Sequence, residues 1–267
     1  MARSDSGESV LTRVMRILRL FTSASPDLTV SEIARRADLP VATAHRLVAE
    51  LVELGALDRA EDKRVRIGVQ LWELASRSSR TLDLRQAAMP FMEDLLSVVR
   101  HHTQIGVLEG SDVLVLERLS ARGAVTNIAR IAGRLPVHAI SIGLVLLAHG
   151  PGEQWEDVLS RPLERYTPRT VTDPSELRRL LAQIRQDGFV IAPEMITPGS
   201  TGLAAPVRDA HGQAVAALSV VIPSTDVQPR AQVPALLAAA RGISRTLGAP
   251  SPGEHPVRTR GARLSIE

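Results

Sequence analysis

The chain has 267 residues, 44% of them apolar and 23% charged, and a formal net charge of +3, values that suit a globular protein of one small and one medium domain. It contains no cysteine, which excludes disulfide bonds, thiolate chemistry and cysteine-bound metals. It has no run of eighteen apolar residues and no signal-peptide pattern, so we expect a cytoplasmic protein that does not enter a membrane.

The first predicted elements are helices. An amphipathic helix over residues 10–21 is expected to pack behind the two that follow. Thr29 and Glu32 have the spacing of a capping box, which starts a short second helix. The DLP segment at residues 38–40 ends that helix, because the residue before a proline is pushed out of the α region.

A third helix starts at Pro40, which suits a first helical turn, and Gly55 fits its left-handed stop. Its apolar residues recur at spacings of three and four: Ala44, Leu47, Val48, Leu51 and Leu54. A hairpin follows, with Leu57, Val65 and Ile67 in its strands and Glu61-Asp62 in its turn. This order of elements predicts a winged helix-turn-helix domain over residues 8–69, a module that puts one helix into the DNA major groove.

Two sets of side chains are candidates for DNA contacts. Residues on the free face of the third helix and on the helix before it would meet bases and nearby phosphates: Ser31, Arg35, Val41, Ala42, Thr43, His45 and Arg46. Basic residues of the hairpin would meet phosphates: Lys63, Arg64 and Arg66. The alternative for the helices is an ordinary helical hairpin whose polar face is only solvated. The alternative for the basic β-hairpin is a charge cluster that is only solvated. Because the net charge is modest, affinity would depend on placed contacts and on pairing of two copies.

A polar-rich helix over residues 70–82 is predicted to link this domain to a second one, residues 83–249, while residues 250–267 are expected to be disordered. The second domain should open with a helix through His101, capped by Thr81 or Asp83 and bent at Pro90. Two-residue alternation predicts strands over residues 104–108, 113–119, 125–131, 189–192, 202–208 and 213–222. Further helices are expected over residues 141–149, from the Asp173 cap to Gly188, and over residues 232–247. Such an α/β domain with a mostly antiparallel sheet suits a ligand pocket between sheet and helices.

Three segments resemble the IclR-type transcriptional regulators. RLPVHAISIGLVLLA (residues 134–148) and DGFVIAPEMITPGSTGLAAPVRDAHGQAVAALSVVIP (residues 187–223) are similar to that family's signature segments, and LTVSEIARRADLPVATAHRLVAELVELGAL (residues 28–57) to its DNA-reading segment. The resemblance implies an α+β chain, with a winged helix-turn-helix joined by a linker helix to an effector-binding domain of GAF/PAS-like fold. It also implies dimers or dimers of dimers that bind a palindromic double-stranded DNA operator under the control of a small metabolite, often a carboxylic or aromatic acid.

Carried over residue by residue, the resemblance places the effector pocket at Asn127, Leu135, Ser141, Ile142, Ala192, Gly202, Ser219 and Val221, with Glu194 and His138 as further polar groups. Members that bind small keto-acids tend to have an acidic side chain at Ala192, cysteine at Gly202, a small residue at Ile142 and a hydroxyl at Val221. Because these positions are small or apolar here, we expect a roomier pocket for a larger or aromatic acid. Members also usually carry lysine where this chain has Leu144.

Each pocket residue also has a plainer interpretation. His138 and Ser141 would serve as caps or packing residues at the next helix, Glu194 as a solvated loop carboxylate, Gly202 as a turn residue and Ser219 as a filler of the sheet.

Catalysis is an alternative function, but the sequence lacks the motifs for it. The histidines lack metal-ligand spacing, and G-x-S-x-G, P-loop and dinucleotide motifs are absent from the sequence. We therefore expect no catalytic residue, metal or cofactor, and interpret the chain as a ligand-controlled regulator, by preference a repressor. A DNA-binding architectural protein without a ligand is the alternative, disfavoured because the second domain is much larger than dimerisation requires.

Overall fold

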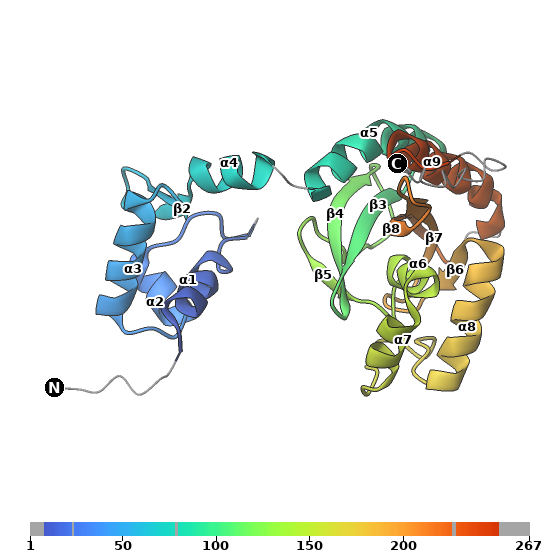
Figure 1. The fold of residues 1–267 in the computed structure, drawn as a ribbon, viewed down its shortest axis with the longest axis horizontal. Coiled ribbons are helices and arrows are strands. Elements are labelled where there is room, and N and C mark those ends of the chain that lie inside the picture. Colours follow the sequence, from blue (N-terminus) through green and yellow to red (C-terminus); the bar gives the residue numbers. More distant parts are fainter. Residues whose placement is uncertain (1–7, 23, 78–79, 226–227, 251–267) are drawn as a thin grey trace, which may run out of the picture. The chain divides into compact units, whose positions relative to one another are not determined.

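The computed structural model describes residues 8–22, 24–77, 80–225 and 228–250, and it divides into two compact units, Met1–Arg80 and Thr81–Glu267 (Figure 1). The expected disordered tail lies, apart from Pro250, outside the described residues. Within the described residues, no helix combines the length and the apolar character needed to cross a bilayer.

The N-terminal unit is a helical domain with one two-stranded sheet. Its elements are α1 (Val10–Leu18), α2 (Val30–Arg36), α3 (Val41–Glu53), β1 (Leu57–Arg59), β2 (Val65–Ile67) and α4 (Val69–Arg77). The strands pair antiparallel, and Leu28 forms a bridge with Val65 that ties the hairpin to the start of α2. The buried apolar face of α3 packs on α2, with Ala44 and Val48 fully enclosed. The predicted winged helix-turn-helix is confirmed.

The turn between α2 and α3 depends on local hydrogen bonds. Asp38 adopts a left-handed backbone, with φ of 50°, and the N–H of Leu39 donates to the Ala34 carbonyl oxygen at 2.9 Å. This is the Schellman arrangement, in which a left-handed residue closes the last turn of a helix. Pro40 is the cap residue of α3 rather than its first helical residue, and Gly55 ends α3 with φ of 65° as expected.

One expectation for α1 is wrong in part. Ile17 is fully buried behind the helix-turn-helix, but Val10 and Leu11 are 46% and 76% exposed. The helix is shorter than predicted, and these two side chains lie on the face turned away from the core of their unit.

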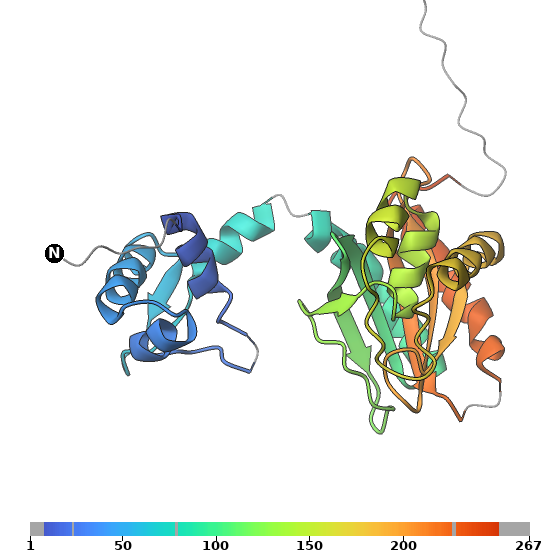
Figure 2. The same ribbon diagram turned by 90° about the horizontal axis from the view of Figure 1, so that it is seen from below.

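The C-terminal unit is a six-stranded antiparallel sheet between layers of helices (Figures 1 and 2). Its strands, in the order β5-β4-β3-β8-β7-β6, are β3 (His102–Glu109), β4 (Asp112–Ser120), β5 (Arg134–Pro136), β6 (Val190–Pro193), β7 (Ser200–Arg208) and β8 (Ala214–Pro223). The helices are α5 (Arg80–Val99), α6 (Ser141–His149), α7 (Gly152–Leu159), α8 (Pro174–Asp187), the 3-10 helix η1 (Pro229–Gln232) and α9 (Val233–Thr246).

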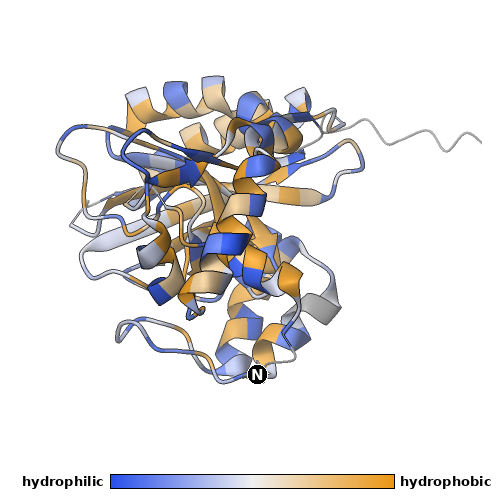
Figure 3. Ribbon diagram, turned by 90° about the vertical axis from the view of Figure 1, so that its left-hand side faces the viewer, coloured by the Kyte–Doolittle hydropathy of each residue, from blue (hydrophilic) through white to orange (hydrophobic). Residues whose placement is uncertain are grey.

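Each face of this sheet has its own core. Met92 of α5 and Leu236 of α9 pack with buried strand residues on one face. Leu144 of α6 and Leu181 of α8 do so on the other. Figure 3 shows apolar and polar residues alternating along the surface helices, as expected for elements with one buried side.

Three predictions for this unit need correction. Residues 125–131 form no strand, because side chains of distant residues take up their carbonyl oxygens, as described below. The helix α5 begins at Arg80, so Asp83 lies in its first turn instead of capping it, and it ends at Val99. The sequence interpretation also missed α7 and the short strand β5.

Candidate functional site

The first candidate surface is the N-terminal end of α3. Val41 is 56% exposed, and Ala42, His45 and Arg46 are exposed beside it, while Thr43 is half-buried. Ser31 and Arg35 are exposed on α2. The short side chains of Val41 and Ala42 leave room for the backbone to approach base edges, as recognition helices require.

Arg46, the residue expected to read a base, has a partner on its own helix. Its Nη1 lies 2.7 Å from Oε1 of Glu50, and both side chains are at least half exposed. An exposed pair of this i,i+4 kind is worth about 0.3–0.5 kcal/mol. A bidentate contact to a base discriminates by about 1–3 kcal/mol, so Arg46 would exchange Glu50 for DNA readily.

The three hairpin residues predicted to meet phosphates divide into two groups. Lys63 and Arg66 are exposed, and Lys63 sits at the tip with a left-handed φ of 66°. Arg64 is half-buried, and its Nη1 donates to the carbonyl oxygen of Asp27 at 3.0 Å and lies 3.7 Å from Glu32. Arg64 therefore braces the hairpin against the start of α2, and a phosphate contact would have to share its guanidinium.

The start of α2 is fixed by the predicted capping box. The N–H of Glu32 donates to Oγ1 of Thr29 at 3.2 Å, and the N–H of Thr29 donates to Oε2 of Glu32 at 2.8 Å. The hydrogen bonds from the Thr29 backbone and hydroxyl hold the pKa of the Glu32 carboxyl below its ordinary value, with smaller help from Arg64 and Arg36. The helix-turn-helix thus begins on a charged, hydrogen-bonded cap.

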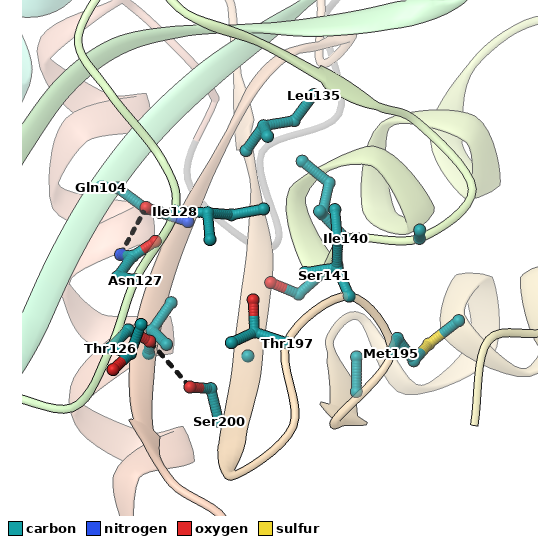
Figure 4. Close-up of a pocket in the computed structure, with 15 residues that line it drawn as sticks. Gln104, Thr126, Asn127, Ile128, Leu135, Ile140, Ser141, Met195, Thr197 and Ser200 are labelled. Carbon is teal, nitrogen blue, oxygen red and sulfur yellow. Dashed lines mark hydrogen bonds between the residues drawn. The ribbon is translucent and has the colours of Figure 1, made fainter. Parts of the chain in front are cut away.

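The second candidate site is a cavity in the C-terminal unit, between the sheet and the start of α6 (Figure 4). The cavity has a volume of about 40 Å³. The lining side chains carry no formal charge and are Gln104, Thr126, Asn127, Ile128, Leu135, Ala139, Ile140, Ser141, Ala192, Met195, Ile196, Thr197, Ser200, Gly202 and Val221. In Figure 4 the hydroxyls of Ser141 and Thr197 and the side chain of Ile128 point into the same space.

The structure places most of the predicted pocket residues on this cavity. Its lining includes Asn127, Leu135, Ser141, Ala192, Gly202 and Val221. Ala192, Gly202 and Val221 are register partners across β6, β7 and β8, so they form one row on the same face of the sheet.

The remaining predicted residues do not line the cavity. Ser219 is fully buried behind Ser141, with 3.0 Å between the two hydroxyl oxygens, and Ile142 is core. The carboxylate of Glu194 accepts the N–H of Gly199 at 2.7 Å and braces a loop. His138 donates through Nε2 to the carbonyl oxygen of Glu164 at 2.9 Å, a role that neither of its interpretations foresaw.

Gly202 has a packing requirement that the sequence alone did not reveal. A Cβ atom built on it would lie 2.8 Å from Oγ of Ser141 and 3.2 Å from its Cβ. Its backbone is not left-handed, so the constraint is space rather than conformation. Glycine at this position keeps the cavity open beside α6.

Side chains of β3 and β7 hold residues 125–127 against the pocket. His102 donates through Nε2 to the Val125 carbonyl oxygen at 2.5 Å, and Ser200 donates to that of Thr126 at 2.8 Å. The amide of Asn127 donates to Oε1 of Gln104 at 3.1 Å (Figure 4). Burial lowers the pKa of His102, although the hydrogen bond to the Val125 carbonyl oxygen acts in the opposite direction.

Several residues that line the cavity were not predicted from the sequence, among them Gln104, Thr126, Ile128, Met195 and Thr197. Gln104 gave a usable signal, because it is a polar residue inside an apolar strand and is only 4% exposed. The others lie in loops that the fold brings over the sheet, and no local pattern marks them.

Nothing in the described part of the chain offers a metal centre, since no three histidine or acidic side chains gather there. The two candidate sites instead have the character of a nucleic-acid surface and a small-molecule pocket.

Known proteins match both units. Residues 10–61 match the family model described as "IclR helix-turn-helix domain", and residues 77–245 match "Bacterial transcriptional regulator IclR C-terminal". The chain is 32% identical over 248 residues to the HTH-type transcriptional regulator BhcR of Paracoccus denitrificans, a match that covers 91% of this chain and 88% of the relative.

Solved structures agree. An IclR homolog from Microbacterium hydrocarbonoxydans, crystallised in complex with 4-hydroxybenzoate, is 51% identical with a TM-score of 0.85, over 90% of this chain and 99% of the other. An IclR homolog from Microbacterium sp. strain HM58-2 is 49% identical with a TM-score of 0.60, over 91% of this chain and all of the other.

Proposed function

This chain belongs to the IclR family of DNA-binding, ligand-responsive transcriptional regulators, and from that premise we propose that it is a repressor released from a palindromic operator by an aromatic acid. It acts as a dimer or dimer of dimers in the cytoplasm, where bacterial DNA lies. The observation that carries the proposal is the uncharged, mainly apolar pocket beside Gly202 and Ser141.

The residues that line the effector pocket support an aromatic acid as the effector. Ile128, Leu135, Ile140 and Val221 offer apolar surface to a ring, and the positions that would favour a small keto-acid are occupied by Ala192, Gly202 and Val221. The structural relative that is 51% identical was crystallised with 4-hydroxybenzoate. A ring with a polar group at each end matches a pocket of apolar walls and few polar groups.

The effector's carboxylate would lie at the N-terminus of α6. The hydroxyl of Ser141, the first residue of α6, points into the pocket, and the cap residue Ile140 supplies no side-chain acceptor for the free N–H groups there. Such N–H groups and the helix dipole favour an anion without a formal charge in the wall.

Binding requires the pocket to open. About 40 Å³ holds a few waters, whereas ligand pockets usually offer 300–1,000 Å³. Opening would have to move the loop of residues 125–130 or the loop of residues 194–199, since neither is part of a strand or helix, and it would break some of the hydrogen bonds that hold these loops in place.

A strand irregularity links the first of these loops to α5. Leu116 has no partner where the register of β3 and β4 shifts, and one extra residue reverses which face later residues point to. Glu117, 3% exposed, therefore meets Arg85 of α5, whose Nε donates to its Oε2 at 2.7 Å. Arg118 turns to the other face and donates to the carbonyl oxygens of Asn127 and Ala129. Movement of the loop would thus reach α5, which follows the linker helix α4 along the chain.

Pairing of two copies would use apolar residues that the N-terminal unit leaves exposed. Leu11 of α1 is 76% exposed, and Trp72 and Leu74 of α4 are 67% and 64% exposed. Large apolar side chains left exposed in this way are suited to an interface between two copies. Two copies would then present α3 to half-sites one helical turn apart.

Calorimetry with a ligand panel tests the effector class. We expect 4-hydroxybenzoate to bind and glyoxylate and pyruvate to bind at least tenfold more weakly, a difference of about 1.4 kcal/mol. Tight binding of the keto-acids without binding of the aromatic acid would overturn the proposal. Absence of binding by every acid would favour the architectural alternative.

A further inference from the structure

A second, larger hollow adjoins the effector pocket. It is a groove bounded by the loop of residues 165–171, the first part of α8 and strand β6, which lies at the edge of the sheet. The groove has a volume of about 400 Å³, which is ten times the volume of the effector pocket and lies within the usual range of ligand sites. Its walls include Val171, Leu180 and Ile191 as well as Arg165 and Arg169.

The two hollows share two lining residues, Ala192 and Met195. Ala192 has only a methyl side chain, so Met195 is the larger of the two side chains at this shared wall. The backbone of Met195 is held in place, since Oγ1 of Thr170 donates to its carbonyl oxygen at 2.6 Å. Its side chain is buried, but it is unbranched and has three rotatable bonds, so a change of rotamer would not require that backbone to move.

The groove supplies the positive charge that the effector pocket lacks. Arg169 is 63% exposed, and its Nε lies 3.2 Å from Oε2 of Glu194. Glu194 keeps a second donor, the N–H of Gly199, if Arg169 turns to a ligand. The guanidinium of Arg165 already donates to the carbonyl oxygen of Thr170 at 3.1 Å, so it contributes charge more than a free fork. Glu176 of α8 also lines the groove, so the lining carries two guanidinium groups and one carboxylate.

We infer that the effector site extends past Met195 into this groove, so that it accepts aromatic acids longer than a single substituted ring. In the longer acid the phenolic hydroxyl, instead of the carboxylate of 4-hydroxybenzoate, lies at the start of α6. The ring occupies the effector pocket, the spacer takes the place of the Met195 side chain at the shared wall, and the carboxylate meets Arg169. This inference rests on the proposed aromatic effector and names the class more narrowly: a phenolic ring that carries its carboxylate on an unsaturated or aliphatic spacer.

Calorimetry on the full-length chain tests this with 4-hydroxybenzoate and 4-hydroxycinnamate, which differ by a two-carbon spacer. Arg169→Gln should weaken 4-hydroxycinnamate about fivefold, the loss expected for an exposed charge contact, and leave 4-hydroxybenzoate within twofold. Arg178→Gln is the matched control, because Arg178 is likewise exposed and ion-paired, to Glu156, but does not line the groove.

Met195→Ala should raise the affinity for 4-hydroxycinnamate relative to 4-hydroxybenzoate, because the larger side chain at the shared wall is gone. Truncation of a buried methionine destabilises its core, so thermal unfolding of this variant is measured as well. If it does not fold, Arg169→Gln decides, since it alters only a surface side chain.

The outcomes separate the two claims. If the wild-type chain binds neither acid, the aromatic effector class is wrong and the extension falls with it. If 4-hydroxybenzoate binds but 4-hydroxycinnamate does not, or if Arg169→Gln changes both affinities no more than Arg178→Gln, only the extension is overturned.

Discussion

Replacement of Gly202 by alanine tests the geometry of the effector pocket directly. The added Cβ would lie 2.8 Å from Oγ of Ser141, closer than side chains tolerate. Ser141 is 4% exposed and hydrogen-bonded to Ser219 at 3.0 Å, so its hydroxyl can retreat only by breaking that bond. Loss of the bond costs about 1 kcal/mol, and overpacking of a core costs about 1–3 kcal/mol.

The same methyl group also occupies the cavity. Because only about 40 Å³ is free there, and Ser141 is the hydroxyl closest to the start of α6, we expect Gly202→Ala to weaken 4-hydroxybenzoate at least tenfold, or about 1.4 kcal/mol. Calorimetry measures the affinity, and chemical denaturation measures the stability.

Gly152→Ala is the matched control, since a Cβ atom at Gly152 meets nothing within 4 Å. It should leave the affinity unchanged and raise the stability by about 0.4–1 kcal/mol, because Gly152 is the first residue of α7 and alanine is the better helix former, whereas Gly202→Ala should lower both. Unchanged binding and stability in Gly202→Ala would refute the placement of Gly202 against Ser141.

Further predictions concern the DNA surface, a helix cap and a buried histidine. Arg46→Ala should weaken binding to the operator by about 1–3 kcal/mol and binding to random DNA much less, while Lys63→Ala should weaken both alike and lower the salt dependence of binding. Mobility shifts at several salt concentrations measure these effects. Equal losses of affinity for both DNAs in Arg46→Ala would argue against base reading. Thr29→Ala should lower the free energy of unfolding by about 1 kcal/mol through loss of the α2 cap, and substitution of the exposed Ser31 by alanine is the neutral control. Denaturation midpoints that move equally in both variants would count against the cap. Burial, with Arg208 and Arg185 adding to it, lowers the pKa of His149 to about 4. The unfolded chain therefore binds a proton below pH 6.5 that the folded chain binds only near pH 4, so stability should fall as the pH is lowered from 6.5 to about 4. His149→Gln should flatten the melting-temperature profile in that window and leave it unchanged above it.

Elements with local signals at both ends were predictable from the sequence. The helix α8 runs from Pro174 after the Asp173 cap to the left-handed Gly188, as expected, because the cap and the stop are each made by neighbouring residues. The same holds for the capping box at Thr29 and the stop at Gly55. These signals need no knowledge of the rest of the fold.

The segment of residues 125–131 was not predictable, although its apolar residues alternate like those of a strand. Its carbonyl oxygens are taken by His102, Arg118 and Ser200, and Ser200 lies 74 residues away from its partner. Such hydrogen bonds replace strand pairing only once the whole sheet has formed, so local periodicity gives the wrong answer.

The pocket was predictable only in part for the same reason. Strand positions such as Gly202 and Val221 could be placed, because their register in the sheet sets the face they occupy. Ile128 and Met195 reach the cavity from loops. The unpaired Leu116, which reverses the faces of Glu117 and Arg118, also has no mark in the sequence.

Control of DNA binding by an aromatic acid is tested by one coupled measurement. An operator selected from a random duplex pool by the purified chain is titrated in mobility shifts with and without saturating 4-hydroxybenzoate. We expect the acid to raise the dissociation constant for the operator, and the operator to weaken the acid by the same factor in calorimetry, because coupling between two ligands is reciprocal. An operator affinity that stays the same in saturating 4-hydroxybenzoate, or that changes only with glyoxylate or pyruvate, would contradict such control.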